Sequence, residues 1–353
     1  MTEHDTAPIR TEERFDEEVV AAYLREHLPE LVGAADIRFD QFPGGAANLT
    51  YRAVAGDVEL VLRRAPLGEV AKGGHDMARE HRVLSRLWSA FPAAPRAYHY
   101  CDDAAVLGKP FFVMERRRGY VVRTAWPEVF GDDPGVRRRV CEHLVDTLAD
   151  LHEVDPAAVG LGDLGRPSGF VERQVIGWGR RWDAAKTRDV QDMDMLTGAL
   201  LREIPDPQTA AILHNDYKLD NTMVSAAGDL VAVFDWDMAT RGDPLVDLGA
   251  LIGYWVDTGG TTQVVFGSRV QALTPYMSKS EVVERYATRT GFDMGKVRFY
   301  VALAYYRVAV ILEQIYTRYA RGQTTDERFA EFSAAAPLLA ATAREVLEGG
   351  DVL

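Results

Sequence analysis

Residues 212–224 read Ile-Leu-His-Asn-Asp-Tyr-Lys-Leu-Asp-Asn-Thr-Met-Val, and residues 231–237 read Val-Ala-Val-Phe-Asp-Trp-Asp. Three polar groups stand at fixed offsets here: Asp216, Asn221 five residues on, and Asp235 fourteen residues beyond that. The carboxylate of Asp216 can accept a proton, and the side-chain oxygens of Asn221 and Asp235 are hard ligands of the kind that Mg²⁺ prefers. Any one of them alone is typical of a loop or a helix cap, but the joint spacing favours a metal-assisted site.

Short apolar runs place these groups at the ends of strands. Residues 211–213 are apolar, and the polar residues begin where this run stops. Residues 222–224 and 230–234 flank Ala-Ala-Gly-Asp, which predicts a hairpin turn. We expect the hairpin to bring Asp235 back beside Asn221, so that both oxygens reach one metal ion.

The remaining chain predicts two regions of different character, because strand-like runs dominate the first and helical periodicity the second. In the first region we expect helices at 15–28 and 76–88, and strands at 36–42, 48–54, 58–63, 96–101 and 110–114. In the second we expect helices at 135–152, 170–186, 193–202, 245–256, 279–289, 296–319 and 326–347. The sequence thus predicts an α+β fold with two lobes: a small antiparallel-sheet lobe over residues 1–115 and a larger, mainly helical lobe over residues 116–353.

Composition narrows the class of protein. The net charge of −13 disfavours nucleic acid as a partner. The polar N-terminus has no apolar signal core, and no apolar run reaches membrane-spanning length, so we expect a cytoplasmic protein without a membrane partner. We expect the protein to be a monomer or a homodimer. Cys101 and Cys141 are too few for a disulfide framework and are expected to be reduced, structural thiols.

Weaker signals lie outside the opening stretch. Gly44 and Gly45 stand in a loop between two predicted strands, where backbone amides can face a phosphate, although two glycines are also typical of a plain hairpin. Arg63 lies on the third strand, where it is either a phosphate ligand or a surface residue. Asp243 before Pro244 is typical of a helix cap, with Asp247 in the first helical turn, from which it can brace the Asp216 loop from behind.

Together these motifs resemble the aminoglycoside phosphotransferase-like branch of the protein-kinase-like fold. Leu-His-Asn-Asp-Tyr-Lys-Leu-Asp-Asn at 213–221 fits the H-x-D-x-x-x-x-N catalytic loop, and Phe-Asp-Trp-Asp-Met-Ala at 234–239 and Gly-Asp-Pro-Leu-Val-Asp-Leu at 242–248 match further signatures. Val-Leu-Arg-Arg-Ala-Pro at 61–66 and Gly-Lys-Pro-Phe-Phe-Val-Met-Glu at 108–115 are similar to the kinase-like domain of acyl-CoA dehydrogenase family members ten and eleven. The resemblance runs from about residue 30 to about residue 340.

The resemblance implies roles for individual residues. Asp216 is implied as the catalytic base, and Asn221 and Asp235 as the Mg²⁺ ligands. Arg63 is implied at the phosphate-binding strand position, with Glu80 as its helical partner; the wider kinase pattern has lysine there, whereas this subfamily commonly has arginine. The other implied positions are Gly44, Gly45 and Asn48 over the phosphates, the backbone of Glu115 and Arg116 against adenine, and His214 as a residue that orients the loop.

The activity implied is transfer of the ATP γ-phosphate, with Mg²⁺, to the alcohol group of a small molecule. The fused relatives suggest a hydroxyacyl-CoA or hydroxy acid, whose CoA phosphates the arginines at 116–118 and Arg123 could meet, unless these form a solvated connector. The name of the branch and the acidity of the chain favour an aminoglycoside instead. The alternatives are a nucleotide-binding pseudokinase or scaffold, and a haloacid-dehalogenase-like phosphatase using Asp235-Trp236-Asp237. Candidate acceptor-pocket residues, each of which could equally be helix packing, are Arg173, Gln174, Trp178, Trp236, Trp255, Tyr306 and Arg307.

Overall fold

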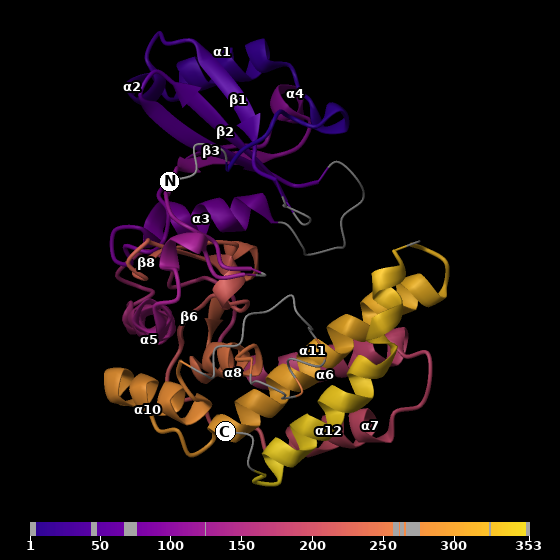
Figure 1. The fold of residues 1–353 in the computed structure, drawn as a ribbon. Coiled ribbons are helices and arrows are strands. Elements are labelled where there is room, and N and C mark those ends of the chain that lie inside the picture. Colours follow the sequence, from indigo (N-terminus) through magenta and orange to yellow (C-terminus); the bar gives the residue numbers. More distant parts are fainter. Residues whose placement is uncertain are drawn as a thin grey trace. The chain divides into compact units, whose positions relative to one another are not determined.

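The computed structural model describes residues 5–43, 48–66, 76–123, 125–256, 261, 265, 276–324 and 326–350 (Figure 1). The chain forms two compact units. Unit 1 consists of Met1–Gly119, Val159–Leu161 and Val231–Ala239, and unit 2 of Tyr120–Ala158, Gly162–Leu230 and Thr240–Leu353. The antiparallel sheet of unit 1 and the helices of unit 2 confirm the predicted α+β class.

Unit 1 is built on a five-stranded antiparallel sheet with strand order β1-β2-β3-β5-β4. Its strands are β1 (Ile37–Gln41), β2 (Leu49–Ala55), β3 (Val58–Arg64), β4 (Ala97–Cys101) and β5 (Phe111–Glu115). Gly56 has φ +59° in the tight turn that joins β2 to β3, a conformation that glycine adopts without strain. Its other elements are η1 (Thr11–Glu13), α1 (Glu17–His27), α2 (Pro29–Val32), α3 (Met77–Leu87), α4 (Ala104–Leu107) and η4 (Trp236–Met238).

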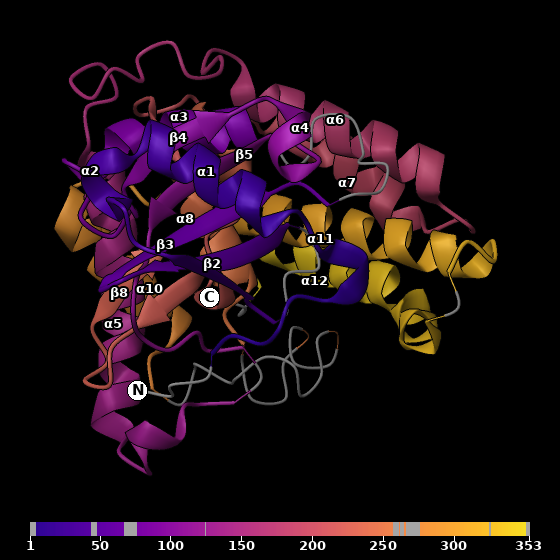
Figure 2. The same cartoon turned by 90° about the horizontal axis from the view of Figure 1, so that it is seen from above.

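Alternation along β3 sends neighbouring side chains to opposite faces of the sheet. Leu60 and Leu62 join the hydrophobic core beneath α1, which crosses one face of the sheet (Figures 1 and 2). Arg64, on the same face, is buried and donates to the carbonyls of Leu107 and Glu13. Arg63 consequently points to the other face, the one against which α3 lies.

Unit 2 is mainly helical. Its helices are η2 (Glu128–Phe130), α5 (Pro134–Glu153), α6 (Phe170–Ala185), α7 (Gln191–Arg202), η3 (Leu219–Asn221), α8 (Leu245–Gly253), α10 (Lys279–Thr290), α11 (Val297–Ala320), η6 (Glu327–Ala334) and α12 (Ala335–Leu347). Figures 1 and 2 show α6, α7, α11 and α12 packed side by side. Helix α8 approaches α11 closely at Gly249, where an added Cβ would lie 2.5 Å from the backbone of Tyr300.

Four further short strands form two pairs. β6 (Ala211–Leu213) pairs antiparallel with β9 (Thr240–Gly242), which the sequence did not predict. β7 (Thr222–Val224) and β8 (Leu230–Val233) form the predicted two-stranded sheet, and the amide of Ser225 donates to the carbonyl of Asp229 in the turn between them. The loop that carries Asp216 therefore follows directly on β6.

One predicted helix is wrong. Residues 326–347 do not form a single α-helix: η6 is a 3-10 helix, and the α-helical hydrogen bonding of α12 begins only at Ala335. Pro337 explains the restart, because proline lacks an amide donor and is accommodated in the first turn of an α-helix. In the described part of the chain, no helix is both long and apolar enough to cross a membrane.

Candidate functional site

The Arg63 cluster of unit 1, made of Arg63, Glu80 and Asp235, joins β3, α3 and the end of β8 through one guanidinium. The Nε of Arg63 donates to Oε2 of Glu80 at 2.9 Å, and its Nη2 forms an ion pair with Oδ1 of Asp235. Asp235 has φ +72°, a left-handed backbone that is uncommon outside glycine and asparagine. The carboxylate of Asp235 is thus aimed by both its backbone and its ion pair.

Negative charge exceeds positive charge in this cluster. Burial raises the pKa of Glu80 to about 7; Arg63 opposes the rise, and the carboxylates of Asp235 and Asp237 add to it. Burial lowers the pKa of Arg63, but its carboxylate neighbours outweigh burial and raise it overall. Among the described residues no hydrogen bond reaches Oδ2 of Asp235, so that oxygen suits a bound cation.

In unit 2, the Asp216 loop (residues 214–221) is held from behind by a buried carboxylate. Asp247 in α8 is fully buried and accepts the amide of His214 on Oδ2 at 2.7 Å and the amide of Asn215 on Oδ1 at 2.8 Å. His152 of α5 lies 3.4 Å from Oδ2 of Asp247 through Nε2 and 2.6 Å from the hydroxyl of Tyr286 through Nδ1. These contacts fix the loop backbone immediately before Asp216.

The carboxylate of Asp216 is itself oriented by its neighbours on the loop. Lys218 donates to both of its oxygens, at 3.1 and 2.8 Å, and Nδ2 of Asn221 donates to Oδ2 at 2.8 Å. The amide of Asp216 donates to Nδ1 of His214 at 3.2 Å, the contact that a loop-orienting histidine needs. Since Nδ2 of Asn221 makes these bonds, its Oδ1 accepts none from the described residues and could ligate a hard cation.

Aromatic and cationic side chains surround the same loop. The ammonium of Lys218 lies 5.1 Å from the ring centre of Tyr254. Burial raises the pKa of Tyr254, with Asp216 adding to the rise and Lys218 and Arg307 opposing it. Arg307 of α11 donates to Oδ1 of Asn215 at 3.3 Å.

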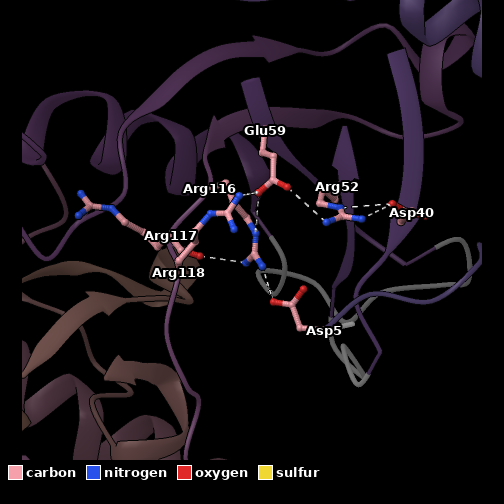
Figure 3. A network of polar contacts seen from close by, with 7 residues as sticks. All are labelled: Asp5, Asp40, Arg52, Glu59, Arg116, Arg117 and Arg118. Atoms are coloured by element: carbon pink, nitrogen blue, oxygen red, sulfur yellow. Dashed lines mark hydrogen bonds and ion pairs between the residues drawn. The ribbon is translucent and has the colours of Figure 1, made fainter. Parts of the chain in front are cut away.

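The connector after β5 carries three successive arginines that pair with carboxylates. Figure 3 shows its arginines in ion pairs: Arg116 with Asp5, and Arg118 with Glu59 at 2.8 Å. Arg117 pairs with Glu115 at 2.5 Å. Carboxylates thus match the charges of these arginines, and their contact with CoA phosphates stays a prediction. The guanidinium of Arg116 also stacks 4.7 Å from the ring centre of Phe42.

Several predicted positions lie in other surroundings. Gly44 and Gly45 fall outside the described residues, while Asn48 is buried immediately before β2. Trp255 and Tyr306 are fully buried and belong to the packed core, not to the wall of a pocket. The indole nitrogen of Trp255 donates to the carbonyl of Met277, and the hydroxyl of Tyr306 is hydrogen-bonded to that of Thr197. Trp236, in unit 1, is likewise buried, and its indole nitrogen donates to the carbonyl of Val233. Arg173 donates to the carbonyls of Ser168 and Arg166. The side-chain oxygen of Gln174 accepts a hydrogen bond from the indole nitrogen of Trp178.

Two residues of the loop escaped the sequence argument. Lys218, which pairs with Asp216, stands two residues after it, and this spacing was the available signal. Asn215, with φ +69°, carries no signal in a single sequence, because its left-handed backbone depends on Asp247 thirty-two residues away.

Metal binding would draw on few protein groups. No cluster of three or more His, Cys, Asp and Glu side chains arranged to hold a metal ion occurs in the described segments. Mg²⁺ usually takes one or two protein carboxylates and completes its shell with substrate phosphates and water. Asn221 and Asp235 fit that pattern by donor chemistry; they belong to different units, and their meeting at one ion stays a prediction.

The chain is similar in sequence to a known protein family and to several known proteins. Residues 38–300 match the model of a family described as the phosphotransferase enzyme family. Acyl-CoA dehydrogenase family member 11 of Rattus norvegicus is 31% identical over 331 residues, 92% of this chain and 42% of that protein. Family member 10 of Mus musculus is 29% identical over 329 residues, 91% of this chain and 30% of that protein. The chain spans less than half the length of these curated relatives.

Solved structures share the fold. One from Ralstonia eutropha JMP134, provisionally named an aminoglycoside phosphotransferase, superposes with a TM-score of 0.80 at 28% identity, covering 95% of this chain and 99% of that one. Aminoglycoside phosphotransferase APH(4)-Ia, in complex with AMP-PNP and hygromycin B, gives a TM-score of 0.59 at 17% identity over 92% of this chain and 99% of its own. The resemblance inferred from the motifs, and the two-lobe protein-kinase-like fold that it implied, are confirmed.

Proposed function

Because the chain belongs to the phosphotransferase enzyme family, we propose that it is an ATP- and Mg²⁺-dependent kinase of small molecules, with an alcohol group as acceptor. The observation that carries the proposal is the Asp216 loop. It presents a carboxylate that Lys218 and Asn221 orient, on a backbone that a buried Asp247 holds. Such a pre-oriented carboxylate is what general-base phosphoryl transfer requires.

In the proposed reaction the acceptor oxygen forms a bond to the γ-phosphorus of ATP, the bond from that phosphorus to the bridging oxygen breaks, and ADP leaves. Asp216 accepts the hydroxyl proton. Lys218, which now neutralises Asp216, could also face the negative charge of the transferred group. Mg²⁺, when bound through Asn221 and Asp235, would neutralise charge on the phosphates.

The nucleotide site is proposed for unit 1. Arg63 is the candidate phosphate ligand, supported by its anchoring to Glu80 on α3. Asn48, Gly44 and Gly45 are the proposed cover of the phosphates, and the backbone of Glu115 and Arg116 the proposed adenine contact. A structure of the same fold holds AMP-PNP and another holds GDP, which supports a nucleotide ligand and leaves the choice of base open.

For the acceptor we propose a hydroxyacyl-CoA or a hydroxy acid. Support comes from the name shared by the curated relatives, acyl-CoA dehydrogenase family members 10 and 11. An aminoglycoside is the second candidate, favoured by the name of the structure at 28% identity and by the net charge of −13. Phosphorylation assays with both classes of acceptor separate the two.

The test of the proposed function is Asp216→Asn. Loss of the base should lower kcat by at least about 100-fold while the protein stays folded, as judged by its thermal melting. The exposed Asp132→Asn is the matched control and should change kcat by less than twofold. Near wild-type turnover by Asp216→Asn would refute the assignment, and absence of any ATP-dependent transfer by the wild type would leave the pseudokinase alternative standing.

A further inference from the structure

The connector after β5 is held by carboxylates from two other parts of unit 1. Arg116 pairs with Asp5 of the N-terminal segment and lies 3.8 Å, through Nε, from Oε2 of Glu59 on β3 (Figure 3). We call Asp5, Glu59 and Arg116 the connector clasp. The side chains of Arg116 and Glu59 are only 11% and 18% exposed, so water screens their charges less than it screens those of a fully exposed pair.

The N-terminal segment that carries Asp5 is fixed to the sheet of unit 1. Ala7 and Gln41 exchange two backbone hydrogen bonds of 2.8 Å, which adds a bridge to the edge strand β1. Ile9 is buried in the hydrophobic core of the same unit. Asp5 therefore meets Arg116 from an anchored backbone, which lowers the entropy cost of forming the ion pair.

Arg116 also contacts the end of β1, where the chain leads to Gly44. Its guanidinium lies 4.7 Å from the ring centre of Phe42, a cation–π contact. The amide of Phe42 donates to the carbonyl of Thr50 at 3.0 Å, so this residue is held against β2. One side chain thus joins the connector to the residue two positions before Gly44. In the proposed function these are the two ends of the nucleotide site, the adenine contact and the cover of the phosphates.

We propose that the connector clasp positions the nucleotide site, because its ion pairs hold the connector backbone in the geometry in which adenine binds. This inference rests on the proposed function and assigns Asp5 and Glu59 as positioning residues, which act through Arg116 and not by touching the nucleotide. A connector released from the clasp would have to be ordered when the nucleotide binds, and that ordering weakens affinity. The effect should therefore fall on nucleotide binding and not on the chemical step.

The experiment compares wild type with Asp5→Asn, Glu59→Gln, Arg116→Gln and the double variant Asp5→Asn/Arg116→Gln. Isothermal titration with AMP-PNP and with adenosine measures affinity, and adenosine, which carries no phosphate, separates positioning from a change of charge. Steady-state kinetics give kcat and the KM values of ATP and of the acceptor. Hydrogen exchange of the backbone amides of residues 115–119 reports on the connector itself. Asp57→Asn, at an exposed carboxylate in the turn between β2 and β3, is the matched control.

We expect Asp5→Asn to weaken both AMP-PNP and adenosine about three- to fivefold, the scale of one partly exposed ion pair. KM for ATP should rise by the same factor, connector exchange should quicken, and kcat and the acceptor KM should stay within twofold. Glu59→Gln should behave like Asp5→Asn. Arg116→Gln, which also loses the Phe42 contact, should weaken both ligands about tenfold. The double variant should match Arg116→Gln within twofold, because Asp5 acts through Arg116.

Unchanged nucleotide affinity in Asp5→Asn and Arg116→Gln, with turnover intact, would overturn the inference and leave the kinase assignment standing. A lower melting temperature without loss of nucleotide affinity would overturn it as well, since the clasp would then serve only the stability of unit 1. Tighter AMP-PNP binding by Asp5→Asn, with adenosine unchanged, would show that this carboxylate repels phosphates and does not position the connector. Absence of nucleotide binding and of turnover in the wild type would overturn the kinase assignment, and this inference with it.

Discussion

The Arg63 cluster and the Asp216 loop present carboxylates in opposite ways. In the Arg63 cluster a side chain orients the carboxylates, because the guanidinium of Arg63 bridges Glu80 and Asp235. Asp235 lies 172 residues from Arg63 along the chain. In the Asp216 loop the carboxylate is oriented by backbone hydrogen bonds to the buried Asp247 and by nearby side chains such as Lys218. We infer that substitutions in the first should alter ligand binding more than stability, whereas loss of the support behind the second should alter stability as well.

The largest effect is expected at Asp247. Asp247→Ala leaves the buried amides of His214 and Asn215 without their acceptor, and breaking a buried polar network of this kind costs about 3–5 kcal/mol. Urea unfolding measures the loss, and kcat should fall with it. Asp247→Asn, which keeps one acceptor oxygen, should lose less. A cost below about 1 kcal/mol for the alanine variant would show that the loop does not depend on this carboxylate.

The next effect concerns the cation expected at Asp235. Asp235→Ala should weaken Mg²⁺-dependent nucleotide binding at least about 100-fold, which is ~2.7 kcal/mol. Titration of AMP-PNP with and without Mg²⁺ measures it. Asp235→Asn is the matched control, because asparagine tolerates the left-handed backbone and retains a ligand oxygen while it loses the charge. Unchanged Mg²⁺-dependent affinity in both variants would remove Asp235 from the metal site.

The same comparison explains how much the sequence could predict. The strand end at Leu213 and the spacing from Asp216 to Asn221 are local patterns, and the structure contains the strands and the turn that they imply. Strand β9 went unpredicted because three residues are stable as a strand only when paired with β6, a contact that no local pattern encodes. Period-two alternation alone places Arg63 and Arg64 on opposite faces, yet only the fold reveals that Arg64 is the buried structural one.

The ion-pair partners of charged side chains were harder to predict than the positions of those side chains in the fold. The arginines at 116–118 form a basic run in the sequence, but Arg116 and Arg118 pair with carboxylates from elsewhere in unit 1, Asp5 and Glu59. Arg307 looks like an interruption in an apolar helix, and the structure shows it in contact with the Asp216 loop. The partners of a charged side chain depend on long-range contacts, so a single sequence leaves them open.

The smallest effect is expected for Arg63→Lys. Lysine keeps the charge but cannot fork between Glu80 and Asp235, so kcat/KM for the nucleotide should fall only about tenfold, the equivalent of one weakened hydrogen bond. Arg63→Met is the control that also removes the charge. Arg63 now opposes the burial that raises the pKa of Glu80 to about 7, so the methionine variant should raise that pKa further.

The sign of the pH dependence follows from that pKa. A carboxyl whose pKa is higher in the folded than in the unfolded protein binds more protons when folded, so stability falls as pH rises from the ordinary value of 4.5 to the folded value. In wild type this loss ends near pH 7. In Arg63→Met it should continue above pH 7, so that the stability gap to wild type widens between pH 7 and roughly pH 9, whereas Arg63→Lys should show no widening. Urea unfolding across this range measures the gap, and a constant gap in Arg63→Met would mean that Arg63 does not hold the charge on Glu80.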